Sequence, residues 1–400
     1  MLEGIKVVEY ATYIAAPGCG GMMADWGADV IKVEPPGGDP IRKFFDSIGT
    51  ESAQNPVFDM DNRGKRSIVL DTADPKGKAV LQKLASEADV FLTNVRPAGL
   101  ARAGLDYDSL KTNNPRLVYA SVTGYGLEGP DIDRPGFDVS AFWARSGMAT
   151  LMAPKGVDPF VIRTGMGDHI TSMATCAGVL AALVERSRTG KGRLVEASLL
   201  RAANYAMASD MAITHAFGKI ASTRPRPQSV QPLGNFFQSS DGKWFVLVPR
   251  QGDADWAPIC RALGLDHLIA DDRFTKSKAR RQNGPELVGL IDEAFARYTF
   301  EEIAARLDAE SLAWAPAQTA VDASRDPQMI AAGGVVDIPQ ADGTTRKAPG
   351  SPLRFPGADD GPKGPAPKPG EHTRSVLAQA GFDGDEIENL IASGVAREGL

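Results

Sequence analysis

The stretch RSIVLDTADPKGKAVLQKLASEADVFLTN, residues 66–94, contains one complete strand–helix–strand pattern. Its two ends, Arg66–Asp71 and Asp89–Asn94, are short runs rich in apolar residues, which is typical of buried strands. Between them, Asp74 stands at an N-cap position, Pro75 stands at the first helical position, and apolar residues then recur at helical spacing. Because a helix of this length joins two parallel strands, the stretch predicts a parallel α/β sheet.

The same alternation continues on both sides of this stretch. Four further runs predict strands: Ile5–Tyr10, Asp29–Glu34, Arg116–Val122 and Arg193–Ser198. A helical pattern over Ala177–Arg188 precedes the last of them and ends in a glycine-containing turn, TGKG. The first half of the chain therefore predicts one large, mainly parallel sheet with helices between its strands.

The pattern changes after residue 220. The segment Arg224–Pro232 has neither a helical nor a strand period, and it precedes a new strand, Trp244–Pro249, and a helical stretch, Asp253–Gly264. We expect a second, smaller domain over residues 225–324. Prolines and glycines crowd residues 348–370, which predicts an extended crossover before two helical patterns at the end of the chain.

Composition and charge exclude several classes of protein. The formal charge of −6 comes from mixed acids and bases, so no polybasic surface is expected for nucleic acid or an acidic membrane. The three cysteines are far apart, without a CxxC pair or a histidine spaced to complete a metal site. The first eleven residues do not resemble a signal peptide, and apolar runs such as Ala177–Val184 are too short to span a bilayer. We expect a soluble, cytoplasmic protein in a reducing compartment, with no metal, no nucleic acid and no membrane as partners.

The most suggestive local sequence for chemistry is Gly165-Met-Gly-Asp168-His169, an acid after two glycines and ahead of a helical pattern. One interpretation is that Asp168 is only the N-cap of that helix. The other is a reactive carboxylate whose pKa the helix N-terminus lowers and beside which it supplies N–H groups. His169 suggests a general base, but neighbours on a helix point about 100° apart, which favours a packed or surface histidine.

Two other patterns suggest ligand binding. The glycine-rich run Ala16–Gly21, expected to form a loop after the first strand, does not spell GxGxxG, so a nicotinamide cofactor is not favoured and the glycines instead indicate close packing. Basic residues cluster in Asn62–Arg66, and Asn94, Arg96 and Arg102 follow a strand. They are either ligands of the phosphates of a nucleotide-bearing cofactor or ordinary solvated charges.

Taken together, five blocks resemble the class III CoA-transferase family, the CaiB/BaiF family, whose members include formyl-CoA transferase, carnitine CoA-transferases and α-methylacyl-CoA racemase. The blocks follow one another in the order that is typical of the family. They are LEGIKVVEYATYIAAPGCGGMMADWGADVIKVEPPGGDPIR, NRGKRSIVLD, the FLTN-RP segment, ASVTGYG and GVLAALVERSRTGKGRLVEASLL.

The resemblance implies an α/β fold with a Rossmann-like domain around a six-stranded parallel sheet, built from both chain ends, and a smaller inserted α+β domain. On this basis residues 1–205 and 325–400 form the large domain, residues 206–224 a linker and residues 225–324 the small domain. The family also implies an interlocked homodimer.

For function, the resemblance implies a CoA-transferase that moves CoA from an acyl-CoA to a carboxylic acid acceptor. Asp168 matches the family nucleophile, which attacks the thioester and forms covalent intermediates, and N–H groups near Gly165 and Gly167 are candidate donors to the oxyanion. The positions that match CoA-binding residues are Tyr13, Ile14, Ala15, Lys65, Asn94, Val95 and Arg102. A family arginine after the second strand is replaced by Pro35, with Arg42 or Arg96 as substitutes.

Two alternatives to transfer stay open. Racemase relatives use a histidine in a GHD-like phrase, which here is Gly136-Phe137-Asp138, and phenylalanine cannot exchange a proton. A catalytically silent CoA-binding homologue is the other. The small domain has an isolated Gly234 where formyl-CoA transferase has a glycine run, so we expect a larger acyl group than formate or oxalate. The aromatic candidates for lining a pocket for this acyl group are Phe137, Phe142, Trp143, Phe236 and Phe237, although the core interpretation is favoured for each of them taken singly.

Overall fold

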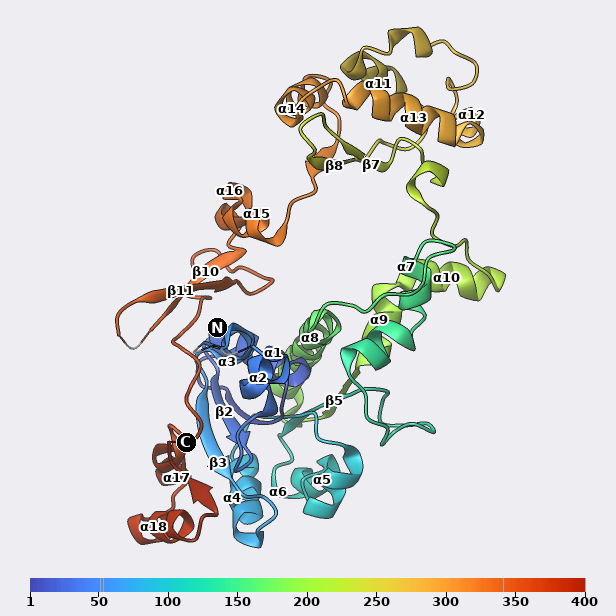
Figure 1. Ribbon diagram of the computed structural model, residues 1–400. Helices are drawn as coiled ribbons and strands as arrows, with labels where there is room; N and C mark the ends of the chain where they lie inside the picture. Colours follow the sequence, from blue (N-terminus) through green and yellow to red (C-terminus); the bar gives the residue numbers. More distant parts are fainter. Residues whose placement is uncertain (51, 53, 341, 400) are drawn as a thin grey trace. The chain divides into compact units, whose positions relative to one another are not determined.

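The computed structural model describes all residues of the chain except 51, 53, 341 and 400. Contacts divide the chain into two compact units. Unit 1 contains residues 1–150, 160–220 and 330–400, and unit 2 contains residues 151–159 and 221–329. The residues expected to link two domains, 206–224, include a helix, α10 (Ala208–Phe217), that belongs to unit 1. The two units are described separately (Figure 1).

Unit 1 is built on a seven-stranded sheet in the order β12-β3-β2-β1-β4-β5-β6. Its strands are β1 (Lys6–Tyr10), β2 (Asp29–Glu34), β3 (Arg66–Leu70), β4 (Val90–Thr93), β5 (Val118–Thr123), β6 (Leu194–Ser198) and β12 (Ala396–Arg397). The first six are parallel, which confirms the expected large parallel sheet, and β12 from the end of the chain adds an antiparallel edge next to β3. The strand order reverses at β1, which has β2 on one side and β4 on the other. The crevice at the carboxyl ends of such strands is where open α/β sheets bind ligands.

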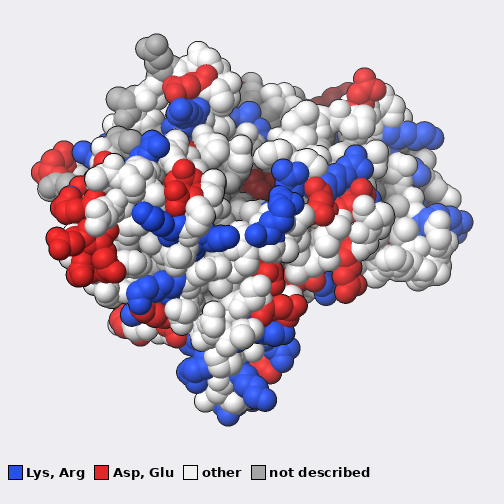
Figure 2. Space-filling view, turned by 90° about the horizontal axis from the view of Figure 1, so that it is seen from below, with Lys and Arg blue, Asp and Glu red and all other residues white. Residues whose placement is uncertain are grey.

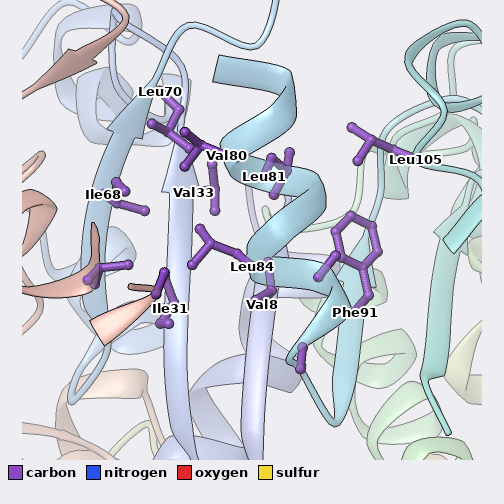
Figure 3. Close-up of a cluster of buried hydrophobic side chains, with 14 of the residues drawn as sticks. Val8, Ile31, Val33, Ile68, Leu70, Val80, Leu81, Leu84, Phe91 and Leu105 are labelled. Carbon is purple, nitrogen blue, oxygen red and sulfur yellow. The ribbon is translucent and has the colours of Figure 1, made fainter. Parts of the chain in front are cut away.

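The strand–helix–strand stretch folds as expected. Helix α4 (Pro75–Ser86) begins after Asp74, whose side chain accepts a hydrogen bond from the Lys76 N–H at 2.7 Å. Its apolar face packs on strands that are buried on both sides, so that Val80, Leu81 and Leu84 point toward the sheet (Figure 3). This buried face, more than helix propensity, stabilises α4 in its place.

The glycine-rich run 16–21 is helical, which corrects the expected loop. It forms most of α1 (Ala15–Asp25), and the glycines are needed for close packing, as the sequence indicated. A Cβ on Gly18 would lie 2.6 Å from the Ser172 hydroxyl oxygen, and one on Gly21 would lie 2.8 Å from the main-chain oxygen of Asp61. Tertiary packing on both sides therefore offsets the low helix propensity of glycine.

The partner of α1 is α8 (Met166–Thr189), which is longer than the expected Ala177–Arg188 and ends at Gly190 with φ +73°. At 24 residues it is, in the described part of the chain, the one helix whose length and apolar composition would allow it to cross a membrane. In unit 1 it packs against α1 and β6, with Cys176 and Val179 in the core.

The remaining helices of unit 1 surround the sheet or follow it. They are α2 (Phe44–Ser47), α3 (Pro56–Asn62), α5 (Pro97–Ala103), α6 (Tyr107–Asn113), α9 (Leu199–Ala206), α17 (Thr373–Gln379) and α18 (Gly384–Ala392), with a 3₁₀ turn η1 (Pro40–Lys43) and a π-helical turn η2 (Asp138–Ala144). Helix α7 (Met148–Met152) includes the boundary between the two units at residues 150 and 151. A hairpin, β10 (Val335–Pro339) and β11 (Thr345–Pro349), precedes the Pro/Gly-rich crossover, which has no regular structure up to α17.

Unit 2 has its own core and mixes a small antiparallel sheet with helices, an α+β arrangement. The sheet contains β7 (Asn235–Gln238), β8 (Trp244–Leu247) and β9 (Trp314–Pro316). The helices are α11 (Trp256–Leu263), α12 (Ser277–Gln282), α13 (Gly284–Phe295), α14 (Phe300–Ala309) and α15 (Ala320–Arg325), with short 3₁₀ turns η3 (Arg226–Gln228) and η4 (Asp266–Leu268), and α16 (Pro327–Ala331) spans its end. Phe237, Phe245 and Phe295 form its aromatic centre, which places Phe237 in the core rather than on a pocket.

Candidate active site

A cavity of about 560 Å³ lies in unit 1 where β1 and β4 end, at the reversal of strand order. Its lining comes from the loop after β1 (residues 12–15), the loop after β4 (94–97), the end of β5 (122–124), residues 134–138, and Thr164 and Asp168 at the start of α8. Single residues, Ile41, Phe44, Ile132 and Leu199, complete it. The sheet topology thus brings segments distant in sequence to one site.

The loop after β1 is held in a strained conformation. Tyr13 has φ +64°, a value that is rare for residues other than glycine. Its N–H donates to Asp39 Oδ1 at 3.1 Å, and the side-chain amide of Asn94 exchanges two hydrogen bonds with the backbone of Thr12, at 3.1 and 2.7 Å. Such strain persists only where surrounding contacts determine the backbone, as they do at functional sites.

Asp39 is in turn held by a buried cluster of charges under the loop. Lys32 Nζ lies 2.8 Å from Asp39 and 3.0 Å from Glu9, and both partners are fully buried side chains. Lys65 Nζ lies 2.6 Å from Glu9 and also donates to Pro17 O at 2.9 Å. Burial lowers the pKa of Lys65, although Glu9 opposes that change. Lys65 is therefore a buried ion-pair partner of Glu9 and does not line the cavity.

Asp168 occupies the third position of α8 and is not its N-cap. The N-cap is Gly165 with φ +81°, and Asp138 Oδ2 accepts the Gly165 N–H at 2.8 Å. Gly167 is required by close packing, since a Cβ there would lie 2.5 Å from the ring of the buried Phe142. The capping interpretation is wrong because another carboxylate, from η2, holds the start of the helix and leaves Asp168 on the cavity.

Burial and nearby charge raise the pKa of Asp168 to about 7. Burial is the largest cause, and the charge of Asp138 adds to it, whereas His169 acts in the opposite direction. The sequence predicted a lowered pKa from the helix N-terminus, and that expectation is wrong in sign, since desolvation outweighs the dipole here. A carboxyl with such a pKa can be ionised near neutral pH and remains more basic than an ordinary aspartate.

His169 pairs with a different carboxylate. Its Nε2 lies 3.0 Å from Oδ1 of the buried Asp61, in α3, while the imidazole itself is about half exposed. The hydrogen bond with Asp61 is the main reason why the pKa of His169 is raised, and burial opposes it. The pair with Asp61 therefore favours the protonated form of His169, whose charge acts on the neighbouring Asp168.

Two helices begin at the cavity, because Ala15 starts α1 and Asp168 lies in the first turn of α8. The first N–H groups of a helix have no partner inside it and carry partial positive charge. The Gly165 N–H, one expected donor to an oxyanion, is already bound by Asp138. The Met166 N–H donates to Arg163 O at 3.3 Å, which leaves the N–H groups of Gly167 and Ala15 as candidate donors to a developing negative charge.

The predicted CoA-binding positions divide into two groups. Five of them line the cavity: Tyr13, Ile14, Ala15, Asn94 and Val95. Lys65 is buried elsewhere, and Arg102 lies exposed on α5, outside the lining.

The two candidate substitutes for the missing family arginine also differ. Arg96 lines the cavity. Arg42 instead donates to both carboxylate oxygens of Glu34 at 2.7 Å and stacks over Phe58. Arg134 on the lining escaped the sequence analysis because no motif surrounds it, whereas Asp138 stood in a phrase noted only for its phenylalanine. Of the aromatic candidates, Phe137 lines the cavity, and Phe142 and Trp143 are core.

Comparisons with known proteins match the whole chain. A family model described as CoA-transferase family III matches residues 2–373. The (R)-2-hydroxy-4-methylpentanoate CoA-transferase of Clostridioides difficile is 34% identical over 399 residues, which cover 99% of this chain and 100% of that protein. The cinnamoyl-CoA:phenyllactate CoA-transferase of Clostridium sporogenes is 34% identical, with 98% of this chain and 96% of that protein covered. The crystal structure of a CAIB/BAIF family protein from Brucella suis has a TM-score of 0.83 at 32% identity, over 95% of this chain and 99% of the other.

Proposed function

Because the chain belongs to CoA-transferase family III, we propose that it transfers CoA from an acyl-CoA thioester to a carboxylic acid through covalent intermediates on Asp168. The family expected from the five sequence blocks is thereby confirmed, and with it an enzyme that acts on acyl-CoA. The observation that carries the proposed mechanism is the position of Asp168, a partly buried carboxyl with a pKa of about 7 on a cavity where two helices begin.

In the first half-reaction the Asp168 carboxylate attacks the thioester carbonyl carbon, and the carbon–sulfur bond breaks to release the CoA thiolate. The product is a mixed anhydride between Asp168 and the acyl group. The thiolate then attacks the side-chain carbonyl carbon of Asp168, which releases the donor acid as a carboxylate and leaves an aspartyl-CoA thioester. The acceptor carboxylate reverses these two steps, forms its own thioester and restores Asp168.

The surroundings of Asp168 support this chemistry. The N–H groups at the start of α1, near Ala15, can stabilise the oxyanion of each tetrahedral intermediate. Burial keeps the carboxylate poorly hydrated, and therefore nucleophilic, and limits water that would hydrolyse an anhydride. Arg96 and Arg134 on the lining are the cations available for the phosphates of CoA.

Trapping an intermediate tests the mechanism. The protein is incubated with an acyl-CoA and then with hydroxylamine, which converts an aspartyl thioester or anhydride into a stable hydroxamate. We expect peptide mass spectrometry to find this hydroxamate on residue 168, and Asp168→Ala to lose transfer while still binding CoA. Full activity of Asp168→Ala would refute the covalent mechanism.

The same protein sample distinguishes a CoA-transferase from a racemase and from a silent homologue. Phe137 has no ionisable group where racemase relatives have their histidine, so we expect no acceptor-independent exchange of the substrate α-proton in deuterated water. Rapid exchange without transfer would favour a racemase, and CoA binding without either reaction would indicate a silent homologue.

We also propose that the protein is cytoplasmic and acts as a homodimer. Unit 1 exposes large apolar side chains on neighbouring helices, Tyr205 on α9 and Ile213 and Phe217 on α10, with Tyr205 82% and Phe217 71% exposed. Exposed apolar groups of this kind are typical of a surface covered by another chain. Sedimentation equilibrium of the wild type and of Phe217→Ser tests the dimer; a monomeric wild type at micromolar concentration contradicts it.

On the face that Figure 2 shows, basic and acidic side chains are both widely spread. The partners that we propose are an acyl-CoA donor and a carboxylic acid acceptor, both bound in the cavity of unit 1.

A further inference from the structure

We propose that Tyr13 and Phe137 form the wall that contacts the acyl group and that they select an apolar monocarboxylic acyl group, aromatic or branched. This inference rests on the proposed function, because it concerns the acyl group of the thioester that Asp168 attacks. In this proposal Tyr13 and Phe137 select the acyl group, and Asp168 carries out the reaction.

Both aromatic residues lie at the Asp168 end of the cavity. Phe137 directly precedes Asp138, whose Oδ2 accepts the Gly165 N–H at 2.8 Å. Tyr13 directly precedes Ile14, whose Cδ1 lies 3.2 Å from the place that a Cβ on Gly165 would take. Since Gly165 is the N-cap of α8, both aromatic residues are attached to groups that contact the start of the helix carrying Asp168.

The two rings are arranged for contact with an apolar ligand. Their centroids are 5.6 Å apart and their planes meet at 88°, a favourable edge-to-face geometry. Phe137 is nevertheless 56% exposed and Tyr13 40% exposed, although both line a cavity. An apolar acyl group against the pair would remove this surface from water, which favours binding.

Hydrogen bonds hold the backbone of both aromatic residues in place, and that of Tyr13 is strained. Tyr13 has φ +64° and is held there by Asp39 and by Asn94, which binds the residue before it. The Phe137 N–H donates to Ser140 Oγ at 3.0 Å at the start of the π-helical turn η2. Backbone held in this way at a cavity indicates that the side-chain position matters to a ligand.

Charge near the wall disfavours a dicarboxylic acyl group. The carboxylate groups at this end are Asp168 and the buried Asp138, close enough for the Asp138 charge to affect Asp168. His169, the nearby group that can carry a positive charge, already pairs with Asp61 at 3.0 Å, so a second carboxylate on the substrate would meet mainly the negative charges of Asp168 and Asp138. Of the two lining cations, Arg96 lies on the loop after β4, whereas Arg134 shares the segment of Phe137 and lies 3.5 Å from the carboxylate of Asp131.

The test is isotope exchange between an acyl-CoA and its own ¹³C-labelled free acid, which needs no knowledge of the natural acceptor. Four thioesters are compared on the full-length protein: 3-phenylpropanoyl-CoA, 4-methylpentanoyl-CoA, acetyl-CoA and succinyl-CoA. We expect kcat/KM for the first two to exceed that for succinyl-CoA by about tenfold or more.

Variants then test the wall itself. Phe137→Ala should lower the ratio of kcat/KM for 3-phenylpropanoyl-CoA to that for acetyl-CoA by about tenfold, and Phe137→Leu should restore part of it. Tyr13→Gly, which adopts the same backbone without strain, should lower the ratio as well. The matched control is Phe355→Ala, which removes an edge-to-face pair with Trp26 (5.5 Å, 82°) away from the cavity and should leave the ratio unchanged.

The outcomes separate the two proposals. Exchange that is fastest with succinyl-CoA overturns the inference and leaves the proposed function intact. Equal losses for all four thioesters in Phe137→Ala and Tyr13→Gly, with the fold retained, also overturn it, because a merely structural role does not change selectivity. No exchange with any thioester in the wild type overturns the proposed function and, with it, this inference.

Discussion

Replacing Asp168 by asparagine is expected to stabilise unit 1 at pH 8 while abolishing transfer. Raising the pKa of this carboxyl from 3.8 to about 7 penalises its ionised form by up to about 4 kcal/mol, because one pKa unit is worth about 1.4 kcal/mol. Since the side chain is only partly buried, we expect a gain of about 2–4 kcal/mol in the free energy of unfolding of the variant.

The sign of the pH dependence follows from linkage. Between pH 3.8 and 7 the folded wild type binds more protons at residue 168 than the unfolded chain does, so its stability falls as pH rises through this range. The advantage of Asp168→Asn should therefore be absent near pH 4 and complete above pH 7. Asp385→Asn is the matched control, an exposed aspartate also in the first turn of a helix, and should show no comparable gain.

Thiol protection in urea measures unit 1 by itself. Cys19 and Cys176 are free and fully buried in α1 and α8, whereas Cys260 is buried in unit 2. Short pulses of a thiol reagent, read by peptide mass spectrometry at fixed protein concentration, give the unfolding midpoint of each unit. Equal stability of the wild type and Asp168→Asn at pH 8, or an advantage of the variant that grows toward low pH, would refute the reasoning.

Three further results are expected. The value of kcat/KM for exchange should fall as pH drops below about 7, because Asp168 then becomes protonated. His169→Gln should move this fall to higher pH, because the charge of His169 lowers the Asp168 pKa, and an unchanged pH profile contradicts this. Lys65→Met should lower the free energy of unfolding by about 3–5 kcal/mol, because it leaves the buried Glu9 without this partner, and KM for acyl-CoA should not change. A raised KM at normal stability would indicate instead that Lys65 binds the CoA phosphates. Gly21→Ala should cost about 1–3 kcal/mol of stability in urea unfolding, because its Cβ would lie 2.8 Å from a backbone oxygen, whereas Gly37→Ala, with open space around it, should cost little.

The strands of unit 1 were predictable because a parallel sheet buried on both faces needs continuous apolar runs. Asp29–Glu34 has the predicted bounds, and Arg66–Leu70 and Val90–Thr93 differ from theirs by one residue at one or both ends. The run 16–21 was not predictable as a helix, since glycines favour loops unless neighbours require their small size. Those neighbours, α3 and α8, come from distant parts of the chain.

The candidate site was also predictable only in part, because some of its contacts come from distant parts of the chain. Tyr13, Asn94 and Asp168 follow recognisable local patterns, and the sheet brings all three to one cavity. The role of Lys65 could not be read from its basic neighbourhood, because whether a lysine faces solvent or a buried glutamate depends on the packing of β1 and β3.

By itself, the sequence determined the parallel sheet, the family and the aspartate that we propose as the nucleophile, because periodic apolar runs and ordered motifs are properties of the chain. Only the tertiary structure decided the state of that aspartate. Asp138 from η2 holds the N-cap of α8, so Asp168 is left uncapped on the cavity, with burial and a neighbouring carboxylate raising its pKa. Desolvation and charge depend on distances between segments that are far apart in sequence, and folding alone sets those distances.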